Sequence, residues 1–230
     1  MTHHHYPVKQ GEDDWFSMRL GIPTASEFKK IITPAKQQLS SQHKEYADLK
    51  IAEILTGEIQ GVFEPTYWMR RGQIMEAEAR RAYEFANEVS TETAGFFTDE
   101  KGTMGCSPDF LVDDDPEGPG IGEIKCLSAA NCVGYMLAPE IPKEFVPQIQ
   151  GQLMITERNW CDWWMYHPDL SRIKIRTYRD EAFILNLSMC LVQFKESMSK
   201  KIEDLQEKGH WNPVKAKKRS EYEDVTVMAG

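Results

Sequence analysis

The chain has 230 residues, of which 41% are hydrophobic and 27% are charged, and its formal net charge is −9. This is the composition of a soluble globular protein with a sizeable core, and without a run of about 18 apolar residues we expect no membrane span. The acidic balance argues against a protein that coats nucleic acid nonspecifically, but it leaves room for a nuclease, whose metal-binding acids add negative charge.

The N-terminal residues and the cysteines carry no recognisable signal. The first residues, MTHHHYPVKQGEDD, contain no hydrophobic stretch, so we expect no signal peptide. We assign no function to the histidines at positions 3–5. The five cysteines show neither a C-x-x-C pair nor the spacing of a zinc finger. We therefore expect buried or reduced thiols in a cytosolic protein.

The first third of the chain is expected to be helical. Thr24 and Glu27 have the spacing of a capping box, ahead of a helix that ends near position 32. A second helix is predicted over 40–57, where Gly57 can end it, and a third over 66–87.

Short strands dominate the middle of the chain. They are expected near 93–98, 104–107, 110–112, 121–126, 160–166 and 173–178. A helix is predicted over 146–156, because Pro147 fits a first turn, and a long amphipathic helix over 180–208. Helices around a short mixed sheet indicate one α/β (α+β) domain over 1–230. Its parts are N-terminal helices at 12–90, a catalytic core at 91–178 and a C-terminal helix and tail at 179–230.

The stretch GCSPDFLVDDDPEGPGIGEIKC, at 105–126, places two acids and a lysine on neighbouring strands joined by a turn. Strand pairing would bring Asp109 close to Glu123, and Lys125 shares a face with Glu123 because it lies two positions away. Carboxylate oxygens suit hard cations such as Mg²⁺ or Mn²⁺, and the lysine can orient a water or balance charge on a phosphate. The pattern therefore favours a metal-dependent phosphodiesterase site, although E-x-K alone is also typical of an exposed, salt-linked strand face.

Five blocks of the sequence, in order, carry a resemblance to a known family. They are WFSMRLGIPTASE at 15–27, RGQIMEAEAR at 71–80, CSPDFL at 106–111, GEIKC at 122–126 and PQIQGQLM at 147–154. Together they resemble the restriction-endonuclease-like nuclease superfamily, and within it the phage lambda exonuclease group, the YqaJ-type viral recombinases. The chain departs from the family where Phe110 stands in the place of a usual glycine. The resemblance implies a restriction-endonuclease-like core with a short mixed sheet flanked by helices.

The resemblance also implies roles for residues of the core. Asp109 and Glu123 would bind metal together with the backbone carbonyl of Ile124, and Lys125 would be the catalytic lysine. Glu76 would support the second metal or its water shell. Gln150 would lie at the catalytic centre, with Gln148 close by as a DNA contact. Taken alone, Glu76 can equally pair with Arg80 on its helix, and the glutamines can form an exposed polar face.

Further residues are implied to bind DNA. Ser107 would contact the backbone near the scissile phosphate, and Arg19 and Ser26 would bind a 5′-phosphate. Arginine grips phosphate with two hydrogen bonds, and a first helical turn favours anions. Arg19 can equally be an ordinary surface arginine. The acidic turn at 113–120 would repel DNA if it faced the duplex.

The implied activity is a Mg²⁺-dependent 5′-to-3′ exonuclease, with two ions and with Mn²⁺ as a substitute. It would digest one strand of linear double-stranded DNA and leave 3′ single-stranded tails for phage-type recombination. The implied partners are double-stranded DNA ends, two further copies in a homotrimeric ring and a single-strand annealing protein. The implied location is the cytoplasm of a bacterial host, with a phage or prophage gene. A restriction-type endonuclease on the same fold and a catalytically inactive DNA-binding or assembly protein are the alternatives.

Overall fold

The computed structural model describes residues 3–61 and 67–214. Its elements, in chain order, are β1 (His3–Tyr6), α1 (Asp13–Arg19), the 3₁₀ helix η1 (Ala25–Lys30), α2 (His43–Thr56), α3 (Tyr67–Asn87), β2 (Phe96–Asp99), β3 (Gly105–Cys106), β4 (Phe110–Val112), β5 (Gly120–Cys126), α4 (Ala129–Leu137), the 3₁₀ helix η2 (Lys143–Phe145), α5 (Val146–Thr156), β6 (Trp160–Tyr166), β7 (Ile173–Tyr178) and α6 (Glu181–Glu207).

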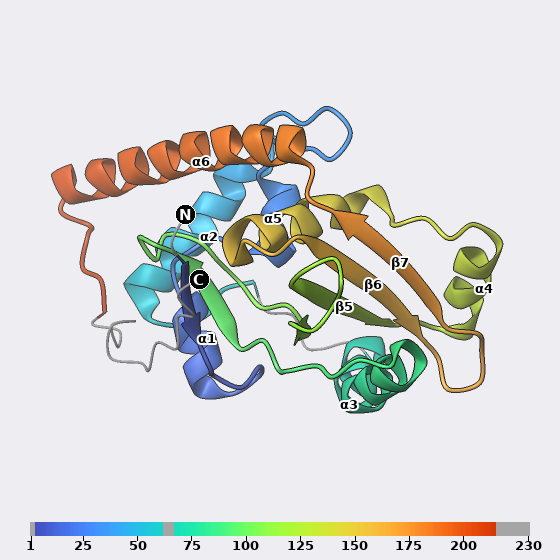
Figure 1. The fold of residues 1–230 in the computed structure, drawn as a ribbon. Coiled ribbons are helices and arrows are strands. Elements are labelled where there is room, and N and C mark those ends of the chain that lie inside the picture. The colour runs from blue at the N-terminus through green and yellow to red at the C-terminus, as the bar shows by residue number, and fades with distance from the viewer. Residues whose placement is uncertain (1–2, 62–66, 215–230) are drawn as a thin grey trace.

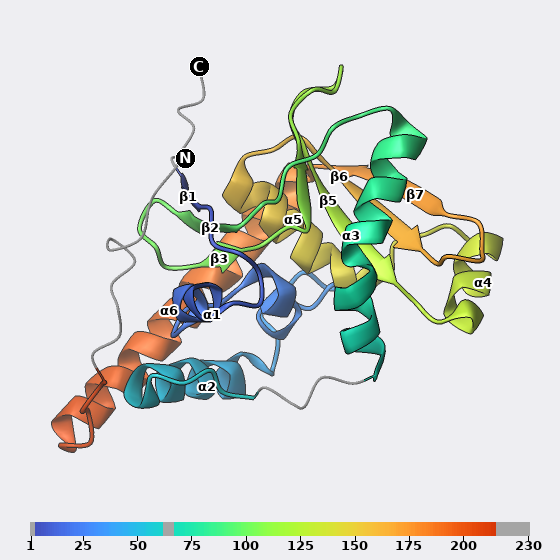
Figure 2. The same cartoon turned by 90° about the horizontal axis from the view of Figure 1, so that it is seen from below.

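The main sheet has the strand order β4-β5-β6-β7. The central strands β5 and β6 are parallel, and both outer pairs are antiparallel. Parallel neighbours need a crossover connection, and here α4, η2 and α5 make up that connection. In Figure 1, α5 covers the upper face of this sheet and α3 covers the lower face, as the view from below in Figure 2 also shows. The predicted short mixed sheet flanked by helices is therefore confirmed.

Alternation along β6 divides the core between the two faces of this sheet. Trp163 belongs to the cluster on the α5 side, whereas Trp160 and Trp164 pack with Ala79 and Tyr83 of α3. Successive side chains of a strand point to opposite faces, so a fully buried strand supplies both cores. The same rule places Glu123 and Lys125 of β5 on the α5 side, and Ile124 on the α3 side.

A small second sheet was only partly expected from the sequence. Its order is β1-β2-β3, and the three histidines at positions 3–5 form most of β1. The ring of His5 stacks on Phe97 of β2, with ring centroids 4.0 Å apart. Three identical residues in a row give no alternation of polar and apolar side chains, which is why the sequence reading missed this strand.

The predicted capping box at Thr24 is wrong. A 3₁₀ helix begins at Ala25, and the side chain of Thr24 makes no capping hydrogen bond. Glu27 pairs instead with Lys30, at 2.7 Å. The hydroxyl of Thr24 accepts a hydrogen bond from Arg19. Helices α1 and α4 were also not predicted, and residue 66, the predicted start of the third helix, lies outside the described residues.

Phe110, which stands where the family usually has glycine, fits because the residue opposite it is a glycine. Phe110 and Gly122 are direct partners across β4 and β5. A Cβ on Gly122 would lie only 1.9 Å from the Cζ atom of Phe110. The ring of Phe110 also packs against Tyr83, at 4.6 Å between centroids. The exchange of glycine for phenylalanine on β4 therefore leaves the strand in place.

The C-terminal helix α6 closes the structure on the α5 side, where it packs on α2 and α5 (Figure 1). Asp180 caps its first turn by accepting a hydrogen bond from the amide of Phe183. Phe183, Leu187 and Phe194 bury one face of the helix in the core. Among the described helices, none has the length and apolar character needed to cross a membrane.

Candidate active site

Asp109 lies directly before β4 and is held against the middle of β5. Its amide donates to the carbonyl of Gly122 at 3.0 Å, and its Oδ2 atom accepts from the amide of Ile124 at 2.5 Å. These two bonds straddle Glu123, so the hairpin brings the two carboxylates together as predicted. A charged acceptor with a backbone donor is a strong, directional contact, which fixes the orientation of the Asp109 side chain.

Glu123 is buried, with 4% of its surface exposed, and three side chains donate to its carboxylate. Lys125 Nζ and Gln148 Nε2 bind Oε1 at 2.6 and 2.7 Å, and Gln152 Nε2 binds Oε2 at 2.8 Å. A carboxylate offers about four acceptor positions, so one remains for a further ligand. Buried charge is tolerated only when it is paired and hydrogen-bonded, and these three donors meet that requirement.

The glutamines of α5 point in two directions. The structure does not bring Gln150, which was predicted at the catalytic centre, to Glu123: its amide nitrogen donates to the carbonyl of Tyr178, and its oxygen accepts from the amide of Asp180. Residues four apart share a helix face, whereas residues two apart do not. Gln148 and Gln152 therefore point together at Glu123, and Gln150 points away. Gln152 is 1% exposed, which also rules out an exposed polar face.

Lys125 is held between the carboxylates and an aromatic ring. Burial alone would lower the pKa of Lys125, but Glu123 and Asp109 outweigh it and raise the pKa above its usual value. Its ammonium group also lies 4.7 Å from the centre of the Phe145 ring. The lysine therefore stays protonated and can act as a fixed positive charge.

Negative charge accumulates around Asp109. Burial, together with the carboxylates of Glu123 and Glu76, raises the pKa of Asp109 well above its usual value. Burial and Glu123 likewise raise the pKa of Glu76, while Arg80 opposes the shift. No ion pair within 4 Å joins Glu76 to Arg80 in the described chain. Glu76, on α3, thus adds to the negative electrostatic potential at this site.

The donor chemistry of this site fits a divalent cation. Three acids whose ionised forms repel one another face a single ammonium group, and a hard cation with oxygen ligands would relieve that repulsion. Within residues 3–61 and 67–214, no three His, Cys, Asp or Glu side chains are arranged so that they could hold a metal ion by themselves. Asp109 and Glu123 would be the side-chain ligands. The role of the Ile124 carbonyl stays a prediction, because the recorded contact of Ile124 with Asp109 is through its amide.

A second polar group lies at the junction of α1 and η1. Arg19 donates to the hydroxyls of Thr24 and Ser26, at 3.2 and 3.4 Å. Its guanidinium lies 4.2 Å from the centre of the Trp15 ring. Among the described residues, no carboxylate lies within ion-pair distance of Arg19. A half-buried arginine beside two hydroxyls, without an acidic partner, can accept an anion.

Trp15 links this polar group to the segment between β3 and β4, which contains Asp109. Its indole nitrogen donates to the hydroxyl of Ser107 at 2.9 Å, and that hydroxyl donates in turn to the carbonyl of Gly95. The single proton of Ser107 is thus already used, so its predicted DNA contact requires that proton to leave Gly95. The sequence reading did not assign Trp15, although it begins the block at 15–27.

The two groups are also packed together through α5. Phe28 of η1 lies against Gly151, where an added Cβ would come within 2.4 Å of the ring, and Ala25 lies beside it. The helix that carries Gln148 and Gln152 therefore touches the 3₁₀ helix that carries Ser26. Arg19 and its hydroxyls are fixed relative to Asp109 and Glu123.

The model of the YqaJ-like viral recombinase domain family matches residues 14–159, which include all five blocks. The chain belongs to this family. A comparison with curated proteins gives no match. The family match confirms the resemblance to the YqaJ-type recombinases that the sequence blocks predicted.

Solved structures agree with this assignment. The alkaline exonuclease LHK-Exo from Laribacter hongkongensis is 28% identical, with a TM-score of 0.75, over 86% of this chain and 98% of that one. Its complex with dAMP gives the same values. A phage-related exonuclease from Haemophilus somnus 129PT is 12% identical, with a TM-score of 0.59, over 80% and 96% of the two chains, and supports the fold alone. The restriction-endonuclease-like core is thereby confirmed.

Proposed function

We propose that this chain is a phage-type exonuclease that hydrolyses one strand of linear double-stranded DNA from its 5′ end. The observation that carries the proposal is the convergence of Asp109, Glu123 and Lys125, with Gln148 and Gln152 bound to Glu123. The family match and the similarity to an alkaline exonuclease support a nuclease activity. The direction of digestion, the duplex substrate and the need for Mg²⁺ are the finer parts of the proposal.

Each residue of the site has a definable task in phosphodiester hydrolysis. Asp109 and Glu123 would hold Mg²⁺, with Mn²⁺ as a substitute and two ions in all, and Glu76 would support the second. When bound, the metal would polarise the phosphodiester and lower the pKa of a coordinated water. Lys125 balances charge that develops on the phosphate or orients the attacking water. Gln148 and Gln152 keep the carboxylate of Glu123 in one orientation.

The group formed by Arg19, Thr24 and Ser26 is proposed to bind the 5′-phosphate of the DNA end. An arginine that lies beside two hydroxyls and has no acidic partner is suited to bind a phosphate. A single anchored end would place the first phosphodiester near Asp109, because Trp15 and Gly151 connect the two groups. Anchoring one end favours removal of nucleotides from that end over cutting within the strand.

The wider context is proposed on the basis of the family. The product would be a duplex with 3′ single-stranded tails for phage-type recombination, in the cytoplasm of a bacterial host. A homotrimeric ring around DNA and a partner single-strand annealing protein complete the proposal.

One assay tests the activity. Linear and closed circular duplexes, labelled at the 5′ or the 3′ end, are incubated with the protein in Mg²⁺ and in a chelator. We expect loss of linear DNA only, release of the 5′ label first, and no reaction in chelator or with Asp109→Ala. Cutting of circles would instead indicate an endonuclease. Binding without any cleavage would indicate an inactive DNA-binding protein.

A further inference from the structure

Three buried polar side chains of α2 lie beneath the turn that connects α1 to η1. Glu53, Tyr46 and Lys50 are 1%, 3% and 7% exposed. Burial of a carboxylate and an ammonium group is costly unless each is fully hydrogen-bonded. Glu53 and Tyr46 each accept a hydrogen bond from a backbone amide of this turn, and Glu53 also accepts from Lys50 and from the amide of Gln60, just beyond α2.

Glu53 binds the beginning of the turn. Its Oε2 atom accepts from the amide of Gly21 at 2.9 Å, and both its oxygens accept from Lys50 at 2.9 Å. Gly21 has a φ of +71°, and an added Cβ would lie 2.5 Å from the Cγ1 atom of Ile54. The backbone just after Arg19 is therefore pressed against α2, in a conformation that favours glycine.

Tyr46 binds the end of the same turn. Its hydroxyl accepts from the amide of Thr24 at 3.2 Å. The turn is thus anchored to one helix at two amides, one after Arg19 and one at the residue whose hydroxyl Arg19 binds. These anchors set the distance between the guanidinium and the hydroxyls of Thr24 and Ser26.

The buried and half-buried cations around the turn differ in whether they have an acidic partner. Lys30 pairs with Glu27 at 2.7 Å, and Lys50 pairs with Glu53. Arg19 has no such partner in the part of the chain that the structure describes. Because Lys50 neutralises Glu53 directly, the buried glutamate can hold the backbone without drawing the arginine away from an incoming anion.

We propose that Tyr46 and Glu53 are positioning residues for 5′-phosphate recognition. They touch neither the phosphate nor the metal site. They act by holding the backbone of the turn at 21–24, so that Arg19, Thr24 and Ser26 keep the spacing that a phosphate requires. This inference rests on the proposed function. Loss of either anchor loosens the grip on the phosphate and leaves the chemistry at Asp109 and Glu123 intact.

The test compares kcat/KM on duplexes that carry a 5′-phosphate or a 5′-hydroxyl, for the unmodified protein, Tyr46→Phe, Glu53→Gln and Arg19→Ala. Tyr46→Phe removes one acceptor and keeps the ring packed against Phe194. We expect it to lower the ratio of the two rates roughly three- to tenfold, the value of one hydrogen bond, with the 5′-hydroxyl rate within about twofold. Glu53→Gln should act in the same direction, and Arg19→Ala should abolish the preference.

Tyr83→Phe is the matched control. It also removes one buried tyrosine hydroxyl, which donates to Asp162 on the opposite side of the sheet. We expect it to lower thermal stability as Tyr46→Phe does, without changing the ratio. If Tyr46→Phe and Glu53→Gln both fold and keep the preference for a 5′-phosphate, while Arg19→Ala loses it, the inference is wrong. The proposed phosphate site at Arg19, Thr24 and Ser26 would then still hold. If Arg19→Ala also keeps the ratio, or the unmodified protein shows no preference, the pocket itself is wrong, and the inference is overturned with it.

Discussion

At the scale of single residues, Glu123 is the centre of the site, because its carboxylate gathers side chains from β5 and from α5. The sequence predicted its neighbours on β5, since a period of two and a short turn are enough to place Asp109, Glu123 and Lys125 together. The helix contacts were harder to predict. Three glutamines alternate along 148–152, and only the true helical phase decides which of them face the strand.

Lys125 is predicted to contribute charge rather than metal ligation, because an ammonium group has donors only. Lys125→Met keeps the stem of the side chain and removes the charge. On the precedent of other preorganised donors, the rate on linear duplex should fall about 10²–10³-fold. Binding of Mg²⁺ by calorimetry and of DNA ends by gel shift should persist. An undiminished rate in a folded Lys125→Met protein would reduce this lysine to a salt-bridge partner of Glu123.

The two glutamine faces of α5 give opposite expectations. Gln148→Leu removes a hydrogen bond to a buried charge, so activity should fall roughly 10–100-fold with little change in Tm.

Gln150→Leu leaves the Tyr178 carbonyl and the Asp180 amide without their partner. It should lower the free energy of unfolding by about 1–3 kcal/mol, or Tm by roughly 2–12 °C, at normal activity per folded molecule. Activity assays beside thermal melts separate the two, and the reverse pattern would contradict the assigned faces.

At the scale of elements, the strands near the site were predictable because each is an apolar run bounded by turn residues. Helices α1 and α4 were missed, since each spans fewer than ten residues and gives only a short pattern to recognise. At η1 the hydroxyl of Thr24 has two competing uses, and contact with Arg19 prevails over capping. Tertiary contacts of this kind cannot be read from local spacing.

The pairing of Phe110 with Gly122 is an interaction between elements that can be tested directly. Gly122→Ala places a methyl group into the Phe110 ring, and overpacking of this kind costs roughly 1–3 kcal/mol. In a Phe110→Ala background the same change should cost almost nothing, because the ring is absent. Urea unfolding of the two single variants and the double variant measures this coupling.

Gly134 offers the control for that experiment. It lies within α4, where an added Cβ would meet no atom within 4 Å. Gly134→Ala should therefore leave the stability unchanged or raise it by up to about 1 kcal/mol. Equal costs of Gly122→Ala in the two backgrounds would show that Phe110 does not depend on this glycine.

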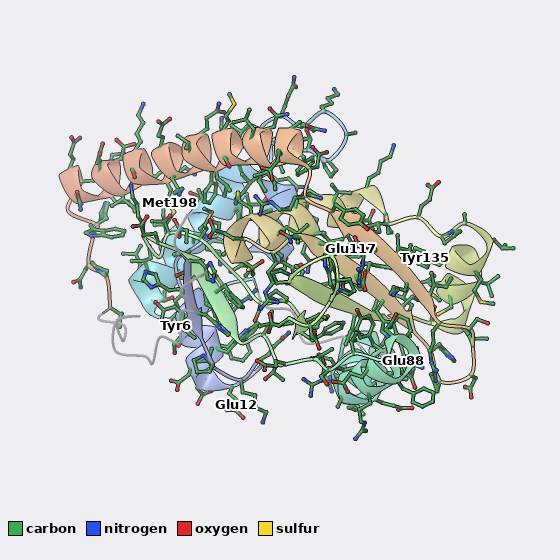
Figure 3. The ribbon with its side chains drawn as sticks, in the orientation of Figure 1. Tyr6, Glu12, Glu88, Glu117, Tyr135 and Met198 are labelled. Carbon is green, nitrogen blue, oxygen red and sulfur yellow. The ribbon has the colours of Figure 1, made fainter. Side chains whose placement is uncertain are left out.

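At the scale of the whole molecule, the charge balance is less unfavourable to DNA than the total of −9 suggests. Arg176 binds Asp115 at 3.1 Å and Glu117 at 3.2 Å, and Arg158 binds Asp113 at 2.7 Å. Glu117 therefore lies beside the strands of the main sheet, as Figure 3 shows. Two arginines, one of which also binds the buried Asp162, therefore offset part of the negative charge of the turn at 113–120, which the sequence alone did not indicate.

The proposed ring is the prediction that belongs to this scale. The ring is proposed on the basis of the family. Ile74 and Phe85 of α3 and Leu185 of α6 are each more than half exposed, so an interface on these helices would have apolar side chains to cover. A closed ring would cover part of such surface and would keep the enzyme on DNA while its contacts slide. The mass measured by light scattering should then be about three times the 26.5 kDa of one chain, and digestion should continue after excess unlabelled DNA is added. A monomeric mass at working concentration, with digestion that stops at once on that challenge, would contradict the ring while leaving the site on β4 and β5 untouched.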